Sequence, residues 1–321
     1  MAHELAIVSG KASIAYVGEK PWHGLGQELT PNSPISVWKE EAGMNWEIKS
    51  SPVTFATPGS ETDRYTGKRV LYRGDTCEPL AVVSDEYNIV QPGEVLDFFQ
   101  DLVTHQGMKL HTAGALFGGR RFWALADTGR AFDVNGSDRI NGMLLLTTSC
   151  DGTLATTAQF TSVRVVCNNT LAFSLSGSDS SHTRTRVSHR SEFDPTAMKS
   201  RLGVLDESWE AFKQNITDMS KQRISERGAR EFIFDLLYKP DRDADNQPRT
   251  VEKDVEEILA RYRNGMGTSK TEGTVWGVLN SITEHVDHTT RARKADQALW
   301  NTWYGKGAAI KSQAYERALM L

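Results

Sequence analysis

The chain has 321 residues, of which 39% are hydrophobic and 24% charged, and its formal net charge is −4. This composition is ordinary for a globular protein of one large domain or two medium ones. No apolar run approaches the roughly 18 residues that a membrane span needs, and the first residues lack a secretory signal pattern. The three cysteines are odd in number and widely spread, which favours a reducing cytoplasm over a disulfide framework.

The first part of the chain is expected to be an irregular segment, 1–60, that packs on the core. Residues 61–176 are expected to form a β-rich core, because short β-branched or aromatic runs alternate there with Gly and Asp turns. One helix interrupts the strands, opened by Pro92 and ended by Gly107. The Asp151-Gly152 step predicts a two-residue hairpin.

The last part of the chain changes character. Residues 177–193 read as a basic polar linker or loop, and 194–321 read as helical, with helices expected near 225–239, 250–264, 273–289 and 294–319. The predicted fold class is α+β: an antiparallel β-rich core with one or two helices, followed by a helical C-terminal region.

A heptad seam opens the helical region, since its apolar residues are spaced alternately by four and three. A seam of this kind can join two copies of the chain in a homo-oligomer, or it can pack two helices of one chain, and both interpretations stay open. Its residues are Met198, Leu202, Leu205, Trp209, Phe212, Ile216 and Met219.

Charge is unevenly distributed along the sequence. Residues 1–100 hold 8 Lys/Arg against 14 Asp/Glu, 101–190 hold 9 against 6, and 191–321 hold 20 against 21. The middle segment is therefore the only basic one. It contains Arg164, Asn168 and Asn169, whose guanidinium and amides suit phosphate and base edges. Alternatively, Arg164 pairs with an internal carboxylate and the asparagines cap a helix or form turns.

Two further groups in the basic segment suit a nucleic acid. Arg120 and Arg121 precede Trp123, and cations beside aromatic rings are typical of single-strand grooves; alternatively, the ring lies in the core and the arginines are solvated. A second group in the polar linker attracts polyanions, or is a solvated loop without a partner. It consists of Arg184, Arg186 and Arg190.

A weak metal candidate lies near the end of the chain. On a helix, Glu284 and His288 are one turn apart, and His285 and His288 are three residues apart. This is not the His-Glu-x-x-His signature, and helix caps or hydrogen bonds between helices are the alternative. Phosphate loops, dinucleotide fingerprints and nucleophile elbows are missing from the sequence. We therefore expect no cofactor, and a binding protein rather than an enzyme.

Several motifs occur together in a fixed order. They are EKPWHGLG, AGMNWEIKSSPV, YNIVQP, RVVCNNTL, GTVWGVLNSITEHVDH and YGKGAAIKSQAYERAL. In these the chain resembles the phage/plasmid-like proteins of domain-of-unknown-function family 932. The resemblance implies a mobile element of a bacterium or its phage and a cytosolic location, and it implies no activity and no catalytic residue.

Three functions compete. The first is single-strand DNA binding or annealing for a phage or plasmid, with the arginines on phosphates and aromatic rings such as Trp123 on bases. The second is an anti-defence protein that captures a nucleotide signal or a host protein. The third is a metal-dependent hydrolase or nuclease that uses the 284–288 cluster.

Overall fold

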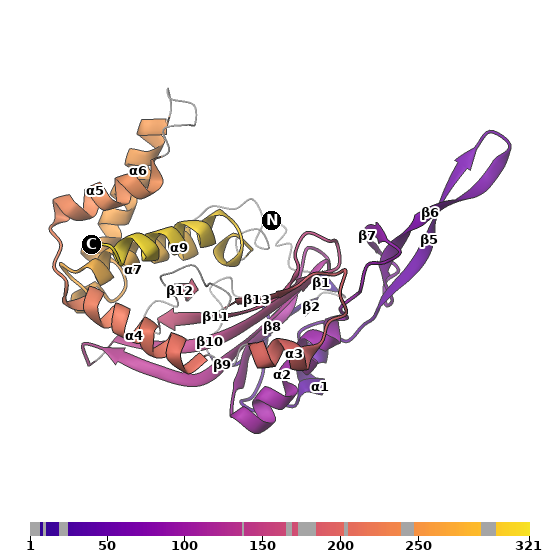
Figure 1. The fold of residues 1–321 in the computed structure, drawn as a ribbon, viewed down its shortest axis with the longest axis horizontal. Coiled ribbons are helices and arrows are strands. Elements are labelled where there is room, and N and C mark those ends of the chain that lie inside the picture. The colour runs from indigo at the N-terminus through magenta and orange to yellow at the C-terminus, as the bar shows by residue number, and fades with distance from the viewer. Residues whose placement is uncertain are drawn as a thin grey trace.

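The computed structural model describes residues 7–8, 11–18, 25–136, 138–164, 169–172, 184–201, 205–238, 247–289 and 300–321 (Figure 1). Strands dominate the first half of the described chain and helices the second, so the predicted α+β class is confirmed. Within these residues, no helix is both long and apolar enough to cross a membrane.

The centre of the molecule is one large sheet in which neighbouring strands are antiparallel, except for one parallel pair at its edge. Most residues of its long strands are buried in succession, as in a sheet that is covered on both faces. The strand order is β12-β11-β10-β9-β8-β3-β4, and β13 also pairs with β11. The strands are β3 (Ile14–Tyr16), β4 (Gln27–Glu28), β8 (Lys109–Leu116), β9 (Arg121–Val134), β10 (Asp138–Ser149), β11 (Thr156–Arg164), β12 (Asn169–Ala172) and β13 (Arg184–Val187).

A second, three-stranded sheet has the order β5-β6-β7 and reaches away from the body as a long ribbon (Figure 1). Its strands are β5 (Ile48–Thr57), β6 (Ser60–Arg73) and β7 (Pro79–Ser84). Most side chains of β5 are exposed, so the outer part of the ribbon contributes little to the core. A short pair, β1 (Ile7–Val8) with β2 (Lys11–Ala12), completes the β structure of the described chain.

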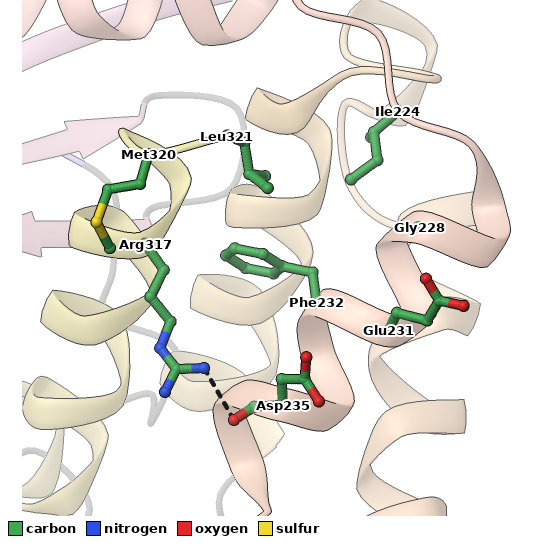
Figure 2. A pocket seen from close by; sticks show the side chains of 8 residues that line it. All are labelled: Ile224, Gly228, Glu231, Phe232, Asp235, Arg317, Met320 and Leu321. Atoms are coloured by element: carbon green, nitrogen blue, oxygen red, sulfur yellow. Dashed lines mark hydrogen bonds between the residues drawn. The ribbon is translucent and has the colours of Figure 1, made fainter.

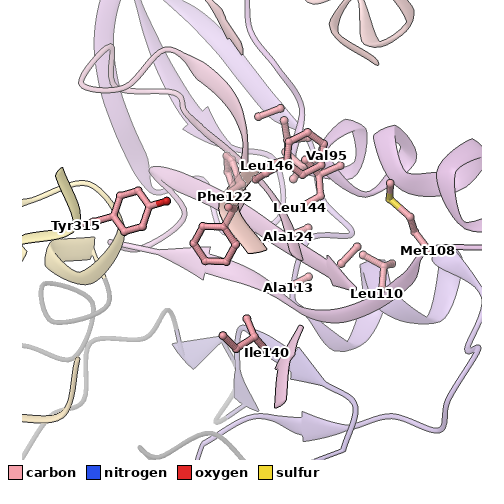
Figure 3. Packing of buried hydrophobic residues seen from close by; sticks show 14 of the residues in the cluster. Val95, Met108, Leu110, Ala113, Phe122, Ala124, Ile140, Leu144, Leu146 and Tyr315 are labelled. Carbon is pink, nitrogen blue, oxygen red and sulfur yellow. The ribbon is translucent and has the colours of Figure 1, made fainter. Parts of the chain in front are cut away.

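One face of the main sheet is covered by α2 (Pro92–Gln106), with α1 (Ile35–Glu41) beside it. The boundaries of α2 confirm the predicted signals, because a capping box joins Gln91 and Glu94, and Gly107 ends the helix with φ 70°. The apolar side chains of α2 and the sheet form the main hydrophobic core, part of which Figure 3 shows.

The helical region confirms the predicted content of 194–321 within its described residues. Its helices are α3 (Pro195–Arg201), α4 (Leu205–Lys221), α5 (Glu226–Leu237), α6 (Gln247–Asn264), a short 3-10 helix η1 (Thr268–Lys270), α7 (Val275–Thr289) and α9 (Lys306–Ala318). The predicted helix at 294–319 differs, because Gly305 separates the helical residues 300–303 from α9.

The described residues of the heptad seam pack inside the chain. Trp209 and Phe212 of α4 meet Phe132 of β9 edge-on at ring distances of 5.4 and 6.2 Å. Phe212 also lies 5.9 Å from the Tyr315 ring of α9. These side chains thus pack against other parts of the same chain. A homo-oligomer that forms through 198–219 stays a prediction, and the packing of these side chains does not support it.

One local expectation was wrong. The connection at Asp151-Gly152 is longer than a two-residue hairpin, because β10 ends at Ser149 and β11 begins at Thr156. In this connection Asp151 accepts hydrogen bonds from Thr153, a local turn that competes with tight pairing. Within 1–60, β3 and β4 extend the main sheet. Domain boundaries at 60, 176 and 193 stay predictions.

Candidate functional site

The second face of the main sheet carries three of the predicted arginines: Arg121, Arg184 and Arg186. Cross-strand neighbours in a sheet share a face. The register aligns Trp123, Thr147, Thr157 and Arg186 in one row across four strands. The neighbouring row of the same face aligns Leu125, Leu145, Gln159 and Arg184.

Arg121 lies on this face at the start of β9, two residues before Trp123. Its guanidinium is held between two rings, 3.7 Å from the centroid of Trp300 and 4.5 Å from that of Phe117. Nε and Nη2 donate to Thr153 Oγ1 at 3.2 and 3.0 Å. Burial lowers the pKa of Arg121, and the charge of Asp151 opposes that shift. The position of this cation is thus fixed by aromatic and hydroxyl contacts.

Arg184 and Arg186 lie two residues apart on β13 and project from the same face. The Arg184 guanidinium lies 5.7 Å from the Tyr304 ring. Burial lowers the pKa of Arg184, and the charge of Arg186 lowers it further. The Nε atom of Arg184 is buried and has no hydrogen-bond partner. Two neighbouring cations, one of them half-buried, therefore repel each other here.

A segment of the helical region, residues 300–304, covers part of this face. Trp303 packs edge-on against Trp123 at a ring distance of 4.8 Å. The Tyr304 hydroxyl accepts a hydrogen bond of 2.5 Å from Thr147 Oγ1, and the Tyr304 ring stacks on that of Trp300. Burial raises the pKa of Tyr304 to about 12, so its hydroxyl is neutral near pH 7.

We call this surface the arginine face: Arg121, Arg184 and Arg186, with the rings of Phe117, Trp300 and Tyr304. Among the described residues, none of its arginines forms an ion pair with a carboxylate. In the helical region the pattern is different, because Arg227 pairs with Glu231 at 2.9 Å and Arg230 with Glu252. Within the part of the chain that the structure describes, the arginine face therefore carries positive charge without a paired carboxylate.

The other predicted residues lie around this face or outside the described part. Arg120 and Arg190 are exposed, in the turns before β9 and after β13. Arg164 ends β11 and pairs in the backbone ladder with Asn169, the first residue of β12, while Asn168 lies outside the described residues. Arg121, Arg184 and Arg186 thus share one face of the sheet, and their convergence with Arg164 on one ligand stays a prediction.

Trp123 requires a correction. Its side chain is only 3% exposed and belongs to a second, smaller core with Ile14, Leu116 and Met143. The ring is therefore buried by its own chain and is not free to stack on a base. The rings that border the arginines are those of Phe117, Trp300 and Tyr304 instead.

Trp300 and Tyr304 were missed in the sequence. A usable signal existed, because Trp300, Trp303 and Tyr304 recur at the spacing of one helical face in a region otherwise rich in polar residues. This spacing does not indicate on which surface the rings pack. That surface depends on how the whole helical region is arranged around the sheet.

The predicted metal residues do not come together as expected. The only group of three potential ligands in the described part joins His285 to Asp254 and Glu257 of α6, and it excludes Glu284 and His288. Glu284 instead accepts a hydrogen bond of 3.2 Å from the backbone nitrogen of Met266. Helical spacing alone thus does not reveal the neighbours of His285 in this group, because they belong to another helix.

A separate pocket of about 580 Å³ lies between α5 and the C-terminal end (Figure 2). Arg317 donates from Nη1 to the backbone oxygen of Asp235 at 2.9 Å, and the side chains of Glu231 and Asp235 add negative charge. The remaining lining is mostly apolar, so this pocket does not suit an anion. It is lined by Ile224, Gly228, Glu231, Phe232, Asp235, Arg317, Met320 and Leu321.

Comparison with known proteins gives a single match. A family model described as "Domain of unknown function (DUF932)" matches residues 79–303. This range contains every residue of the arginine face except Tyr304, which follows its last residue. No curated protein matches the chain, and no solved structure does.

Proposed function

The chain belongs to the family of the domain of unknown function DUF932, and within that family we propose that it binds single-stranded nucleic acid on its arginine face. The observation that carries the proposal is the charge of Arg184 and Arg186, which no carboxylate in the described part of the chain pairs with. A half-buried guanidinium without a carboxylate is unfavourable unless an anion reaches it. Backbone phosphates supply such anions at regular intervals.

The aromatic rings give the face its suitability for a nucleic acid rather than for a simple anion. Phe117, Trp300 and Tyr304 lie directly beside the cations. Grooves for single strands combine charge along the backbone with rings that stack on bases, and this stacking tolerates any sequence. Arg120 and Arg190 are exposed in the turns before β9 and after β13, and they add positive charge at the ends of these strands. In this proposal the protein acts in the cytoplasm of a bacterial host and serves a phage or plasmid.

The burial of Arg184 supports a second candidate, the capture of a small phosphorylated nucleotide. The Arg184 Nε atom is shielded from solvent and unpartnered, and it lies on the face that 300–304 partly covers. A partly enclosed donor suits a compact ligand better than a long strand. This alternative uses the same residues, so the experiment must include both kinds of ligand.

The test is fluorescence anisotropy with a labelled 30-nucleotide DNA strand over a salt series. The variant Arg184→Gln/Arg186→Gln should weaken binding at least tenfold, and the log–log salt slope should fall by about 0.7 for each phosphate contact that is lost. The matched control is Arg227→Gln, because Arg227 is exposed and already paired with Glu231. It should change the affinity less than twofold.

The outcomes separate the candidates. No binding of the strand at low salt, or equal losses in the variant and the control, contradicts the nucleic-acid proposal. Heat on titration with mono- or cyclic nucleotides in the absence of strand binding, abolished in Arg184→Gln/Arg186→Gln, supports capture of a nucleotide.

A further inference from the structure

We propose that Asp254, Glu257 and His285 form a binding site for a divalent transition-metal ion between α6 and α7. One potential ligand atom from each of the three residues lies within 4.8 Å of the other two. Imidazole nitrogen and carboxylate oxygen are ligands that Zn²⁺ accepts. The site is independent of the arginine face, which lies on the main sheet.

Helix geometry explains why these residues meet. Asp254 and Glu257 are three residues apart on α6, so their side chains leave the same side of the helix. His285 comes from α7, which packs along α6. All three residues are half-buried, so the site is accessible to an ion yet partly shielded from bulk water.

An unused nitrogen at the centre of the group points to a ligand. Nδ1 of His285 is buried, has no hydrogen-bond partner, and lies 3.8 Å from Glu257 Oε2. The imidazole side chain as a whole is 16% exposed. Buried polar atoms normally find a partner, and a bound cation would use this lone pair together with both carboxylates.

Charged side chains surround the imidazole of His285. Asp254 and Glu257 bring negative charge to it, and Arg261 brings positive charge. Arg261 donates from Nη1 to the backbone oxygen of Glu257 at 2.7 Å, and Lys253 Nζ lies 3.9 Å from Glu257 Oε1.

The ligand set indicates which ion is bound. Mg²⁺ prefers oxygen ligands and retains its waters, whereas an imidazole nitrogen favours Zn²⁺ and its transition-metal neighbours. Three protein ligands leave at least one position for water. We therefore expect Zn²⁺ to bind and Mg²⁺ not to compete at tenfold excess.

Isothermal titration of the full chain with Zn²⁺ tests the site. We expect one ion per chain, and affinity at least tenfold lower in both His285→Gln and Asp254→Asn. The matched controls are His288→Gln and Glu284→Gln on the same helix, which should change affinity less than twofold. Circular dichroism checks that each variant is folded, and Asp254→Asn provides the test should His285→Gln unfold.

Three results would overturn the proposal: no uptake of Zn²⁺ by the wild-type chain, equal affinity in the wild type and Asp254→Asn, or a loss in His288→Gln as large as that in His285→Gln. The arginine face is untouched by all four substitutions. Failure here is therefore distinguishable from failure of the nucleic-acid proposal.

Discussion

The guanidinium of Arg121 stacks on the ring of Trp300 at 3.7 Å and thereby joins the start of β9 to the C-terminal helical region. A cation over an aromatic ring contributes about 0.5–2 kcal/mol, depending on how far it is desolvated. We predict a coupling energy in this range for the double-mutant cycle of Arg121→Gln and Trp300→Leu, measured by urea denaturation. The control cycle pairs Arg121→Gln with Met320→Ala, an exposed site, and should be additive. Additivity in both cycles would contradict the prediction.

Arg73 and Asp75 form a pair at the base of the ribbon, and the Arg73 side chain is only 1% exposed. Arg73 donates to Asp75 from Nε at 3.0 Å and from Nη2 at 2.7 Å. Burial raises the pKa of Asp75, but the hydrogen bonds and the charge of Arg73 together outweigh it, so the pKa is lowered. A carboxylate whose pKa is lower in the folded than in the unfolded chain stabilises the fold at pH values above its unfolded pKa. This contribution is lost as the pH falls through its folded pKa.

We therefore predict that Asp75→Asn unfolds at lower urea than the wild type above about pH 4, the ordinary range of an aspartate. The difference should shrink as the pH falls below that value. Asp133→Asn is the control, because its carboxylate pairs with Arg139 on the surface, where ion pairs contribute little. A difference between wild type and Asp75→Asn that is constant from pH 7 to pH 2 would contradict the assignment.

Gly119 lies in the turn before β9 with φ +93°, a backbone conformation that residues with a side chain rarely adopt. A Cβ atom there would lie 2.7 Å from Arg73 Nη1 and 2.8 Å from the Trp46 ring. Gly119→Ala should therefore cost about 1–2 kcal/mol for the backbone and about 1–3 kcal/mol more for overpacking. The neighbouring Gly118 has φ +69° and open space around it, so Gly118→Ala should show only the backbone cost. Thermal or urea unfolding measures both variants, and equal losses would refute the steric argument.

Lys311 and Asp287 form an ion pair at 2.6 Å between α9 and α7, with side chains only 4% and 5% exposed. Removing one member of a buried pair leaves an uncompensated charge and costs about 3–5 kcal/mol. We predict a loss of this size for Asp287→Ala in urea denaturation. The double variant Asp287→Leu/Lys311→Met should recover most of the stability, because apolar residues of similar volume often replace such pairs at little cost. No recovery in the double variant would mean that other partners of these residues dominate.

Local signals in the sequence were reliable wherever the chemistry of one segment decides its structure. Pro92 and Gly107 fix the ends of α2 through backbone geometry, and the helices of 205–238 and 247–289 follow from apolar spacing. The Asp151-Gly152 step misled because a side-chain hydrogen bond within the turn competes with the two-residue hairpin. The short strands β3 and β4 were missed because strands of three and two residues show no detectable periodicity in the sequence.

By itself, the sequence determined the α+β class, the order of a β-rich part before a helical part, and the single basic segment that contains the arginines. The tertiary structure alone decided that Arg121, Arg184 and Arg186 share a face, that Trp123 is buried, and that His285 meets residues of α6. The physical reason is that the periodic spacing of apolar side chains, which indicates a helix or a strand, depends only on residues that are near one another in the sequence. Strand register and helix packing, in contrast, depend on pairings between distant segments, and those pairings place Trp300 on Arg121.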